Sequence, residues 1–397
     1  MLYSLALLFL SALIFGEICS KLKLPPLIGM LISGILLGPS VLDLLDGSLL
    51  DISAQLRKIA LIIILTRAGL GLDINALKKV GRPALLMCFL PATAEIAGTL
   101  LLAPRLLGIT LSEAAVLGTV LAAVSPAVVV PGMLKLISGG YGTKKGIPQL
   151  VMAGASVDDV YVIVLFTSFT AIASGDGFSP AQLIRIPFSV FSGLIAGALT
   201  GIAAEFILRK LKASADKIIV AAMSISFLFI YAEDKFTGIF GFSGLLAIMS
   251  MNAVYRKRSP RSAEELSSKY KSLWTAAEMI LFVLVGAAAD IGCVMDSGLK
   301  AAVLVLAVMI FRMGGVFLCV LGTKLNAKER LFCMAAYTPK ATVQAAIGSV
   351  PLAMGLSCGN IVLTAAVLAI LITAPLGAFL IDFLHTRLLE RETASNQ

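Results

Sequence analysis

Residues 125–132 read Ser-Pro-Ala-Val-Val-Val-Pro-Gly, and residues 338–348 read Thr-Pro-Lys-Ala-Thr-Val-Gln-Ala-Ala-Ile-Gly. Both stretches lie inside apolar segments, where a proline removes a backbone donor and interrupts a helix. A membrane tolerates unpaired backbone only where it faces protein or a wet cavity. We therefore predict two broken helices near the middle of a bilayer. The predicted break residues are Ser125, Pro126, Pro131 and Pro339.

The composition of the whole chain is that of a membrane protein. Of its 397 residues, 59% are hydrophobic and 14% are charged, and the mean hydropathy is +0.99. Soluble domains carry about 25% charged residues and roughly 45–50% apolar ones. Although the net charge is +9, this composition excludes a soluble enzyme, a disordered chain and a nucleic-acid-binding module.

Thirteen segments approach the roughly 20 apolar residues that a helix needs to cross the hydrocarbon core. We predict an all-α polytopic membrane protein, with loops too short to hold a separate soluble domain. The thirteen predicted transmembrane helices cover residues 2–19, 25–42, 54–72, 82–103, 112–134, 148–173, 182–208, 216–233, 237–255, 273–292, 298–322, 329–352 and 360–384.

The distribution of basic residues predicts the orientation in the membrane. Of the 32 Lys and Arg residues, 23 lie after odd-numbered segments and six lie after even-numbered ones, while three lie within segments. Cytoplasmic loops are the ones enriched in Lys and Arg. We therefore expect the N-terminus outside and the C-terminus in the cytoplasm.

The thirteen segments divide into two similar halves. The first six span residues 2–173 and the last six span residues 216–384, with one segment between them. Corresponding segments are seven apart in the order, so each pair crosses the membrane in opposite directions. The two interrupted segments occupy matching places, and so do the segments that carry Glu95 and Arg312. We predict inverted-topology repeats, in which two Pro-interrupted helices at equivalent positions indicate the binding site of a transporter.

Five ionisable side chains lie near the middle of predicted helices, where a charge is costly and usually functional. They are Glu95, Asp158, Asp159, Arg312 and Lys340. The adjacent residues Asp158 and Asp159 can hold either a cation or protons. Hard cations prefer oxygen ligands, and neighbouring carboxylates resist joint ionisation. We predict that this pair binds Na⁺ or Li⁺ as the metal ion, in turn with protons.

Two further charge contacts are expected. Lys340 follows the proline of the second break, and buried lysines change protonation readily. We expect it to pair with Asp158 when the site holds no metal ion; the alternative is that it only neutralises the helix ends exposed at the break. Glu95 and Arg312 are expected to form a buried ion pair that ties the two halves together.

Four stretches of the sequence together resemble a known family. They are Leu65-Thr-Arg-Ala-Gly-Leu-Gly-Leu-Asp73, Val124-Ser-Pro-Ala-Val-Val-Val-Pro131, Ala155-Ser-Val-Asp-Asp-Val160 and Thr338-Pro-Lys-Ala-Thr-Val-Gln-Ala-Ala346. With them the chain resembles a bacterial member of the monovalent cation:proton antiporters. Within that family it is most similar to the NHA-type sodium/proton exchangers, which carry an Asp-Asp pair.

The resemblance implies a homodimer in the bacterial inner membrane, with a core transport domain that moves like an elevator against a dimerisation domain. It also implies that the two broken helices cross each other in the middle of the core. The dimerisation domain is expected at residues 1–75 and 215–293, and the core at residues 80–175 and 297–386. A linker helix is expected at residues 180–210.

The resemblance also implies roles for the site residues. By the matching motifs, Asp159 would be the principal carrier of ion and proton, and Asp158 its partner. Lys340 would be the salt-bridging lysine, with Thr342 beside it. Glu95 and Arg312 resemble a charge pair of this subfamily. No enzymatic activity, no resident cofactor and no nucleic-acid partner are expected.

The predicted function is secondary active exchange of Na⁺ or Li⁺ for H⁺, by alternating access of a single carboxylate site. The partners are therefore a monovalent cation, the proton and the lipid bilayer. A K⁺/H⁺ exchanger and a sodium-coupled organic-anion symporter on the same fold are alternatives. An intramembrane aspartyl protease is disfavoured, because its two aspartates must face one water from separate helices, whereas Asp158 and Asp159 are adjacent.

Overall fold

The computed structural model describes residues 1–71, 81–174, 180–236 and 241–392. Within these ranges the regular structure is helical, with one isolated β-bridge between Tyr141 and Arg391. The predicted all-α class is confirmed. Nine helices of the described residues are long and apolar enough to cross a membrane.

The four remaining predicted segments, 25–42, 54–72, 237–255 and 329–352, also contain helices, but these fall short in length or apolar composition. Residues 72–75 of the predicted dimerisation domain and 237–240 of the ninth predicted segment lie outside the described residues. The number thirteen stays a prediction.

Packing divides the chain into two compact units. The first unit combines residues 1–54, 74–162 and 281–397, and the second combines residues 55–73 and 163–280. This grouping does not test the predicted division into core and dimerisation domains, which stays a prediction.

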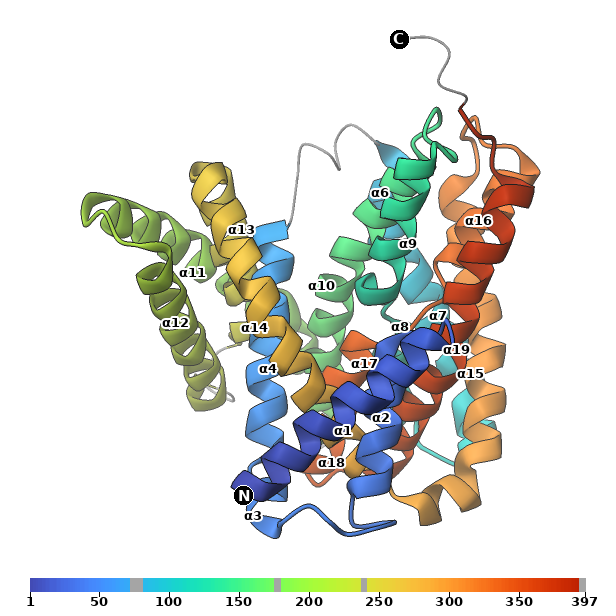
Figure 1. The fold of residues 1–397 in the computed structure, drawn as a ribbon, viewed down its shortest axis with the longest axis horizontal. Coiled ribbons are helices and arrows are strands. Elements are labelled where there is room, and N and C mark those ends of the chain that lie inside the picture. Colours follow the sequence, from blue (N-terminus) through green and yellow to red (C-terminus); the bar gives the residue numbers. More distant parts are fainter. Residues whose placement is uncertain (72–80, 175–179, 237–240, 393–397) are drawn as a thin grey trace. The chain divides into compact units, whose positions relative to one another are not determined.

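The first unit contains the residues predicted to form the site. Two of its helices, α16 and α19, lie side by side (Figure 1). The helices wholly within the unit are α1 (Leu2–Lys21), α2 (Pro26–Leu37), α3 (Gly47–Leu50), α6 (Arg82–Met87), α7 (Leu90–Leu107), α8 (Leu111–Ala122), α9 (Pro126–Gly139), α15 (Ile291–Val320), α16 (Ala327–Ala336), α17 (Thr342–Ile347), α18 (Val350–Ala353) and α19 (Gly359–Leu388).

Helices α8 and α16 occupy matching places in the two halves, and both begin with a capping box. In α8 the N–H of Glu113 donates to Thr110 Oγ1 (3.3 Å), and the N–H of Thr110 donates to the Glu113 carboxylate (2.8 Å). In α16 the N–H of Glu329 donates to Asn326 Oδ1 (2.9 Å), and the N–H of Asn326 donates back (2.8 Å). Each box satisfies donors that a helix start leaves unpaired.

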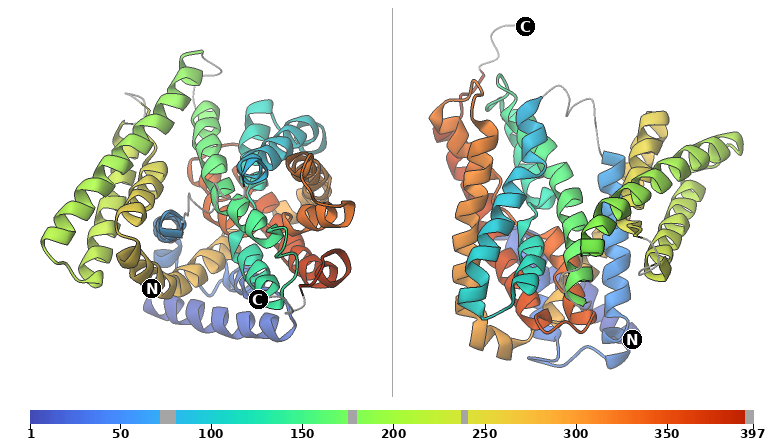
Figure 2. Two further views of the ribbon diagram at one scale, coloured as in Figure 1. Left: turned by 90° about the horizontal axis from the view of Figure 1, so that it is seen from above. Right: turned by 180° about the vertical axis from the view of Figure 1, so that it is seen from behind.

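Two of the helices that carry predicted charges pack against each other. Helix α7 (cyan) carries Glu95 and lies alongside α15 (orange), which carries Arg312 (Figure 2). Helix α10 (Ile147–Ser174) carries Asp158 and Asp159. Apolar side chains from α9, α10, α16 and α19 surround the breaks and form a core. Buried members of this core include Val124, Val129, Met133, Val151, Ala155, Phe332, Tyr337 and Ile381.

The C-terminal segment after α19 is bound to the loop between α9 and α10. The N–H of Gly142 donates to the carbonyl of Glu390 (2.9 Å). In the same loop, Lys145 Nζ lies 2.9 Å from Glu329 Oε1 at the start of α16. This loop therefore joins the ends of three elements within the first unit.

The second unit packs its helices through small residues. A Cβ on Gly197 of α11 would overlap the main chain of Ala247 on α13, so the two backbones approach closely. The helices wholly within this unit are α11 (Pro180–Lys210), α12 (Ala215–Phe236) and α13 (Gly244–Arg258); α4 (Ser53–Gly71), α10 and α14 (Pro260–Ala287) have residues in both units.

Candidate functional site

The two interrupted segments touch each other at their breaks. Helix α8 ends at Ala122 and α9 begins at Pro126, while α16 ends at Ala336 and α17 begins at Thr342. The N–H of Ser125 donates to the carbonyl of Pro339 (2.7 Å). The two breaks predicted from the prolines are therefore present in the fold, and they meet in the crossing that the family resemblance implied.

The predicted break at Pro131 is wrong. Helix α9 runs without interruption from Pro126 to Gly139 and contains Pro131 in its interior. A proline there removes one N–H donor, and a helix can absorb this loss by a local kink. Pro126 differs because it stands at the first position of α9, where its N–H would have no helical partner in any case.

The break leaves the last carbonyls of α8 without helical partners. Pro126 has no N–H to reach back to Ala122. The N–H groups of Val124 and Ser125 bond to Asp158 and Pro339 instead of to α8.

Side chains from the second half of the chain donate to these carbonyls in place of helical N–H groups. Lys340 Nζ donates to the carbonyl of Leu121 (2.5 Å), and Arg312 Nη1 donates to the carbonyl of Ala122. Cations are favourable at this end, where the helix dipole is negative.

Gln344 holds two further carbonyls of the same helix end. Its Nε2 donates to the carbonyl of Val120 (3.1 Å) and to that of Ala123 (2.9 Å). Gln344 belongs to the motif at residues 338–346, whose sequence indicated no role for it. The sequence could have drawn attention to it, because Gln344 is a polar residue within an apolar segment, and such residues mark functional positions in membrane helices.

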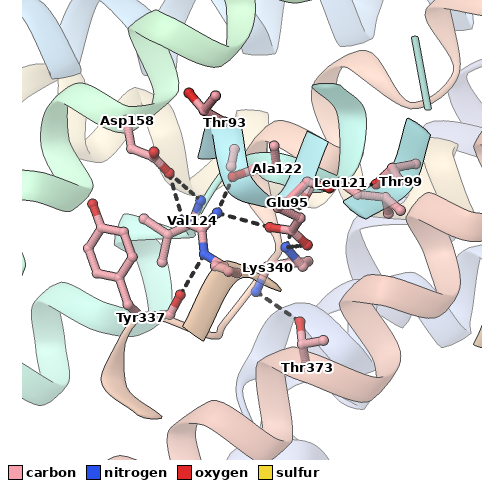
Figure 3. Close-up of polar contacts among 12 residues, drawn as sticks. Thr93, Glu95, Thr99, Leu121, Ala122, Val124, Asp158, Tyr337, Lys340 and Thr373 are labelled. Atoms are coloured by element: carbon pink, nitrogen blue, oxygen red, sulfur yellow. Dashed lines mark hydrogen bonds and ion pairs between the residues drawn. The ribbon is translucent and has the colours of Figure 1, made fainter. Parts of the chain in front are cut away.

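Four buried charges form a continuous chain at the crossing (Figure 3). Asp158 Oδ2 lies 2.8 Å from Arg312 Nη2, and Arg312 Nη1 lies 3.0 Å from Glu95 Oε2. Glu95 Oε1 in turn lies 2.6 Å from Lys340 Nζ. All four side chains are 0% exposed. The expected pair of Glu95 and Arg312 is thus formed, as part of a longer network.

The expected contact between Lys340 and Asp158 is not formed. Lys340 pairs with Glu95 instead, and its backbone N–H donates to Thr373 Oγ1 on α19 (2.9 Å). The Oδ2 atom of Asp158 already accepts from Arg312 and from the N–H of Val124 (2.9 Å). Arg312 lies between Glu95 and Asp158. Its guanidinium therefore occupies the position beside Asp158 that the prediction assigned to Lys340.

Arg312 is the centre of the network. Besides its two carboxylates, it donates from Nε to the carbonyl of Tyr337 (2.8 Å), and its guanidinium lies 5.0 Å from the centroid of the Tyr337 ring. The Tyr337 hydroxyl donates to the carbonyl of Met87 (3.0 Å). A guanidinium suits this position because its five donors stand in a fixed fork.

Asp159 differs from the other acids at the crossing. Its side chain is 6% exposed, and it forms no ion pair with any residue whose side chain the structure describes. The crossing brings together three acids and two bases, so it carries one excess negative charge when all are ionised. That excess falls on Asp159, because the other two acids are already paired with Arg312 and Lys340.

Several oxygen atoms of the crossing are buried without a hydrogen-bond partner. Buried polar atoms usually have one, and an unpaired one costs free energy. Among the described residues, the unpartnered oxygens near the two breaks are Ser125 Oγ, Asp158 Oδ1, Asp159 Oδ1, Thr342 Oγ1 and Gln344 Oε1. Carboxylate, hydroxyl and amide oxygens are ligands of hard cations. The predicted residues Asp158, Asp159 and Thr342 belong to this set.

Comparison with known proteins gives consistent results. A family model described as sodium/hydrogen exchanger, transmembrane, matches residues 6–386. The chain is 36% identical over 419 residues to sodium/hydrogen exchanger 9B2 of Homo sapiens, covering 100% of this chain and 76% of that protein. It is 31% identical over 414 residues to sodium/hydrogen exchanger 9B1 of Homo sapiens, covering 98% and 78%.

A solved structure shares the fold. The sodium proton antiporter MjNhaP1 from Methanocaldococcus jannaschii at pH 8 superposes with a TM-score of 0.83 and 20% sequence identity, and 97% of both chains is covered. At this identity the likeness supports the fold alone.

Proposed function

Because the chain belongs to the sodium/hydrogen exchanger family, we propose that it is a secondary antiporter that exchanges Na⁺ or Li⁺ for H⁺ across the membrane. The observation that carries the proposal is the excess charge of Asp159 at the crossing of the two broken helices. The carboxylate is buried, and no side-chain cation of the described residues is paired with it.

The charge balance of the crossing sets what the site can hold. An ionised carboxylate that is buried without a partner is costly. One proton or one monovalent cation neutralises Asp159, and either of them makes the cluster of Glu95, Asp158, Asp159, Arg312 and Lys340 neutral. Both together would leave a buried positive charge. The two ions therefore compete for one place, which is the requirement for exchange.

The unpartnered oxygens support a cation ligand set. Asp159 Oδ1, Asp158 Oδ1 and Thr342 Oγ1 are buried and free to accept. A small hard cation that enters as cargo would satisfy several of them at once, and it would replace the oxygens of its hydration shell. A proton on Asp159 would satisfy one carboxylate and leave the other unpartnered oxygens as they are. These oxygens therefore favour binding of a metal ion over binding of a second proton.

The bonds between the breaks support movement of the core as one body. Ser125 is bonded to Pro339, and Lys340 and Arg312 hold the end of α8. Separating the half-helices would leave these buried groups unpaired. We propose that the site instead changes its access by an elevator-like movement of a core at residues 80–175 and 297–386. The partner surface is then a dimerisation domain at residues 1–75 and 215–293, in a homodimer.

The proposed orientation in the membrane is the one predicted from the sequence. We propose that the protein lies in the inner membrane of a bacterium, with its C-terminus in the cytoplasm. The asymmetry of Lys and Arg between alternate loops supports this. Protons then enter from outside while Na⁺ or Li⁺ leaves the cytoplasm.

Proteoliposomes test the proposal. The purified protein is reconstituted, a pH gradient is preset, and Na⁺, Li⁺ or K⁺ is added while a pH-sensitive dye is recorded. We expect Na⁺ and Li⁺ to dissipate the gradient, and Asp159→Asn to abolish the response. Asp296→Asn, a change of the same chemistry at an exposed position of α15, should behave as wild type.

Three outcomes would overturn the proposal. A response to K⁺ alone would make the protein a K⁺/H⁺ exchanger. An unchanged Na⁺ response in Asp159→Asn would remove Asp159 from the site. Uptake of an organic anion driven by Na⁺, with no proton movement, would favour the symporter.

A further inference from the structure

Gln344 is a fully buried amide at the crossing. It lies on α17 of the second half, and its Nε2 bonds the end of α8 in the first half. The two hydrogens of the amide are shared by the carbonyls of Val120, Ala123 and, at 3.4 Å, Leu121. The orientation of the amide is therefore fixed, because a flipped amide would turn its oxygen toward three carbonyl oxygens.

The Ala123 carbonyl belongs to the same peptide group as the N–H of Val124. That N–H donates to Asp158 Oδ2 at 2.9 Å (Figure 3). One planar peptide thus accepts from Gln344 at one end and donates to Asp158 at the other. Because the group is rigid and planar, a rotation that moves one end moves the other. Hydrogen bonds in a chain also polarise and strengthen one another.

The helix ladder does not hold this peptide. Ala123 and Val124 lie between α8 and α9, and Ala123 has extended backbone angles (φ −79°, ψ 139°). The bonds from Gln344 and to Asp158 are consequently the ones that fix its plane at the crossing. Asp158 Oδ2 is then held by this peptide and by Arg312, while Oδ1 stays without a partner.

We propose that Gln344 is a positioning residue for Asp158, acting through the peptide group that joins Ala123 to Val124. The inference rests on the proposed function, because it assigns Gln344 to the same ion site. Gln344 keeps the Oδ1 atom of Asp158 in place beside Asp159, and so it sets the affinity for the cation, not the rate of the conformational change.

Gln344→Met is the direct test, because methionine has nearly the same length and volume but no donor. One hydrogen bond corresponds to about a fivefold change in an equilibrium constant. We expect the apparent KM for Na⁺ to rise about fivefold, with the maximal rate within twofold of wild type. Thr119→Val is the matched control: this buried hydroxyl on α8 donates to Val116 of its own helix (2.7 Å) and has no link to Asp158. Its KM should stay unchanged.

A double-mutant cycle supplies a readout that does not depend on transport. The thermal unfolding midpoints of wild type, Gln344→Met, Asp158→Asn and the double variant are measured without Na⁺. If the two residues act through one peptide, their effects are coupled, and the double variant loses less than the sum of the single losses. Additive losses, or an unchanged KM in Gln344→Met, would overturn the proposal.

The two proposals fail in different ways. If the wild-type protein shows no Na⁺ response, the proposed function fails, while the stability cycle still tests the link between Gln344 and Asp158. If Gln344→Met does not yield folded protein, Gln344→Glu takes its place. Its protonated carboxyl donates one hydrogen bond, so its KM relative to wild type should rise with pH; a ratio that stays constant with pH would overturn the proposal.

Discussion

Lys340 Nζ lies 2.6 Å from Glu95 Oε1 and also donates to the carbonyl of Leu121, so one ammonium group joins α7 to the free end of α8. Both side chains are fully buried. Lys340 therefore stabilises the crossing through Glu95 and α8, and it forms no ion pair with Asp158. The alternative interpretation was that this lysine only neutralises an exposed helix end. That interpretation accounts for the contact with Leu121 but not for the ion pair with Glu95.

Glu95→Gln should destabilise the protein strongly. It leaves Lys340 without a carboxylate and Arg312 with Asp158 alone, and removing one partner of a buried pair costs about 3–5 kcal/mol. The double variant Glu95→Gln/Lys340→Met removes both partners, and we expect it to unfold at a higher temperature than Glu95→Gln. Thermal unfolding of the detergent-purified variants measures this. A double variant less stable than both single ones would contradict the assigned pair.

The two adjacent aspartates should differ in their effect on stability. Asp158→Asn loses the charge that pairs with Arg312 and weakens the bond from Val124, so its unfolding midpoint should fall by several degrees. Asp159→Asn removes an unpaired buried charge, so its midpoint should equal or exceed that of wild type. Both midpoints are measured at neutral pH without Na⁺. Equal losses in the two variants would show that Asp159 has a cationic partner.

Gly377 of α19 should not tolerate a side chain. A Cβ there would overlap the ring of Pro339 in the second break. Overpacking of this kind costs about 1–3 kcal/mol, and it would displace the carbonyl that accepts from Ser125. We expect Gly377→Ala to lower both the unfolding midpoint and the transport rate. Gly314→Ala on α15 is the control, because a Cβ there would meet nothing within 4 Å. It should be neutral or slightly stabilising, since alanine favours a helix.

The loop between α9 and α10 gives a pH-dependent prediction. The hydrogen bond to the Glu329 carboxylate raises the pKa of Lys145 above its ordinary value. A lysine with a higher pKa in the folded state stabilises the fold below its unfolded pKa, and the contribution is lost as the pH rises through the folded value. We therefore expect Lys145→Met to lower the unfolding midpoint at neutral pH, and the difference from wild type to shrink at a pH well above about 10.4. Lys144→Met, next to it, controls for the loss of a loop charge.

Much of the fold could be predicted from the sequence, because its determinants are local. The apolar lengths of the segments indicated membrane helices, and the prolines at 126 and 339 marked the places where the two broken helices meet. The pair of Glu95 and Arg312 followed from matching positions in the two halves. Pro131 shows the limit of such local reasoning, because a proline inside a helix does not by itself end it.

The partners at the crossing could not be predicted in the same way. Sequence spacing placed Lys340 beside the second break, but Asp158, Glu95 and the carbonyls at the end of α8 are all candidate partners for its ammonium group. Which of them it bonds depends on how α7, α8 and α15 pack in space. The role assigned to Gln344 depends on a carbonyl that is free only because the opposite helix is broken, which is a property of the assembled fold.

The side chains that bond the C-terminal carbonyls of α8 also bear on biosynthesis. Arg312, Lys340 and Gln344 are synthesised long after α8 has left the ribosome. Until they arrive, the nascent first half holds a helix end that lipid cannot solvate. The first broken helix can therefore take its final position in the bilayer interior only after the final third of the chain has been synthesised. In the order of translation, the second half of the chain completes the fold of the first.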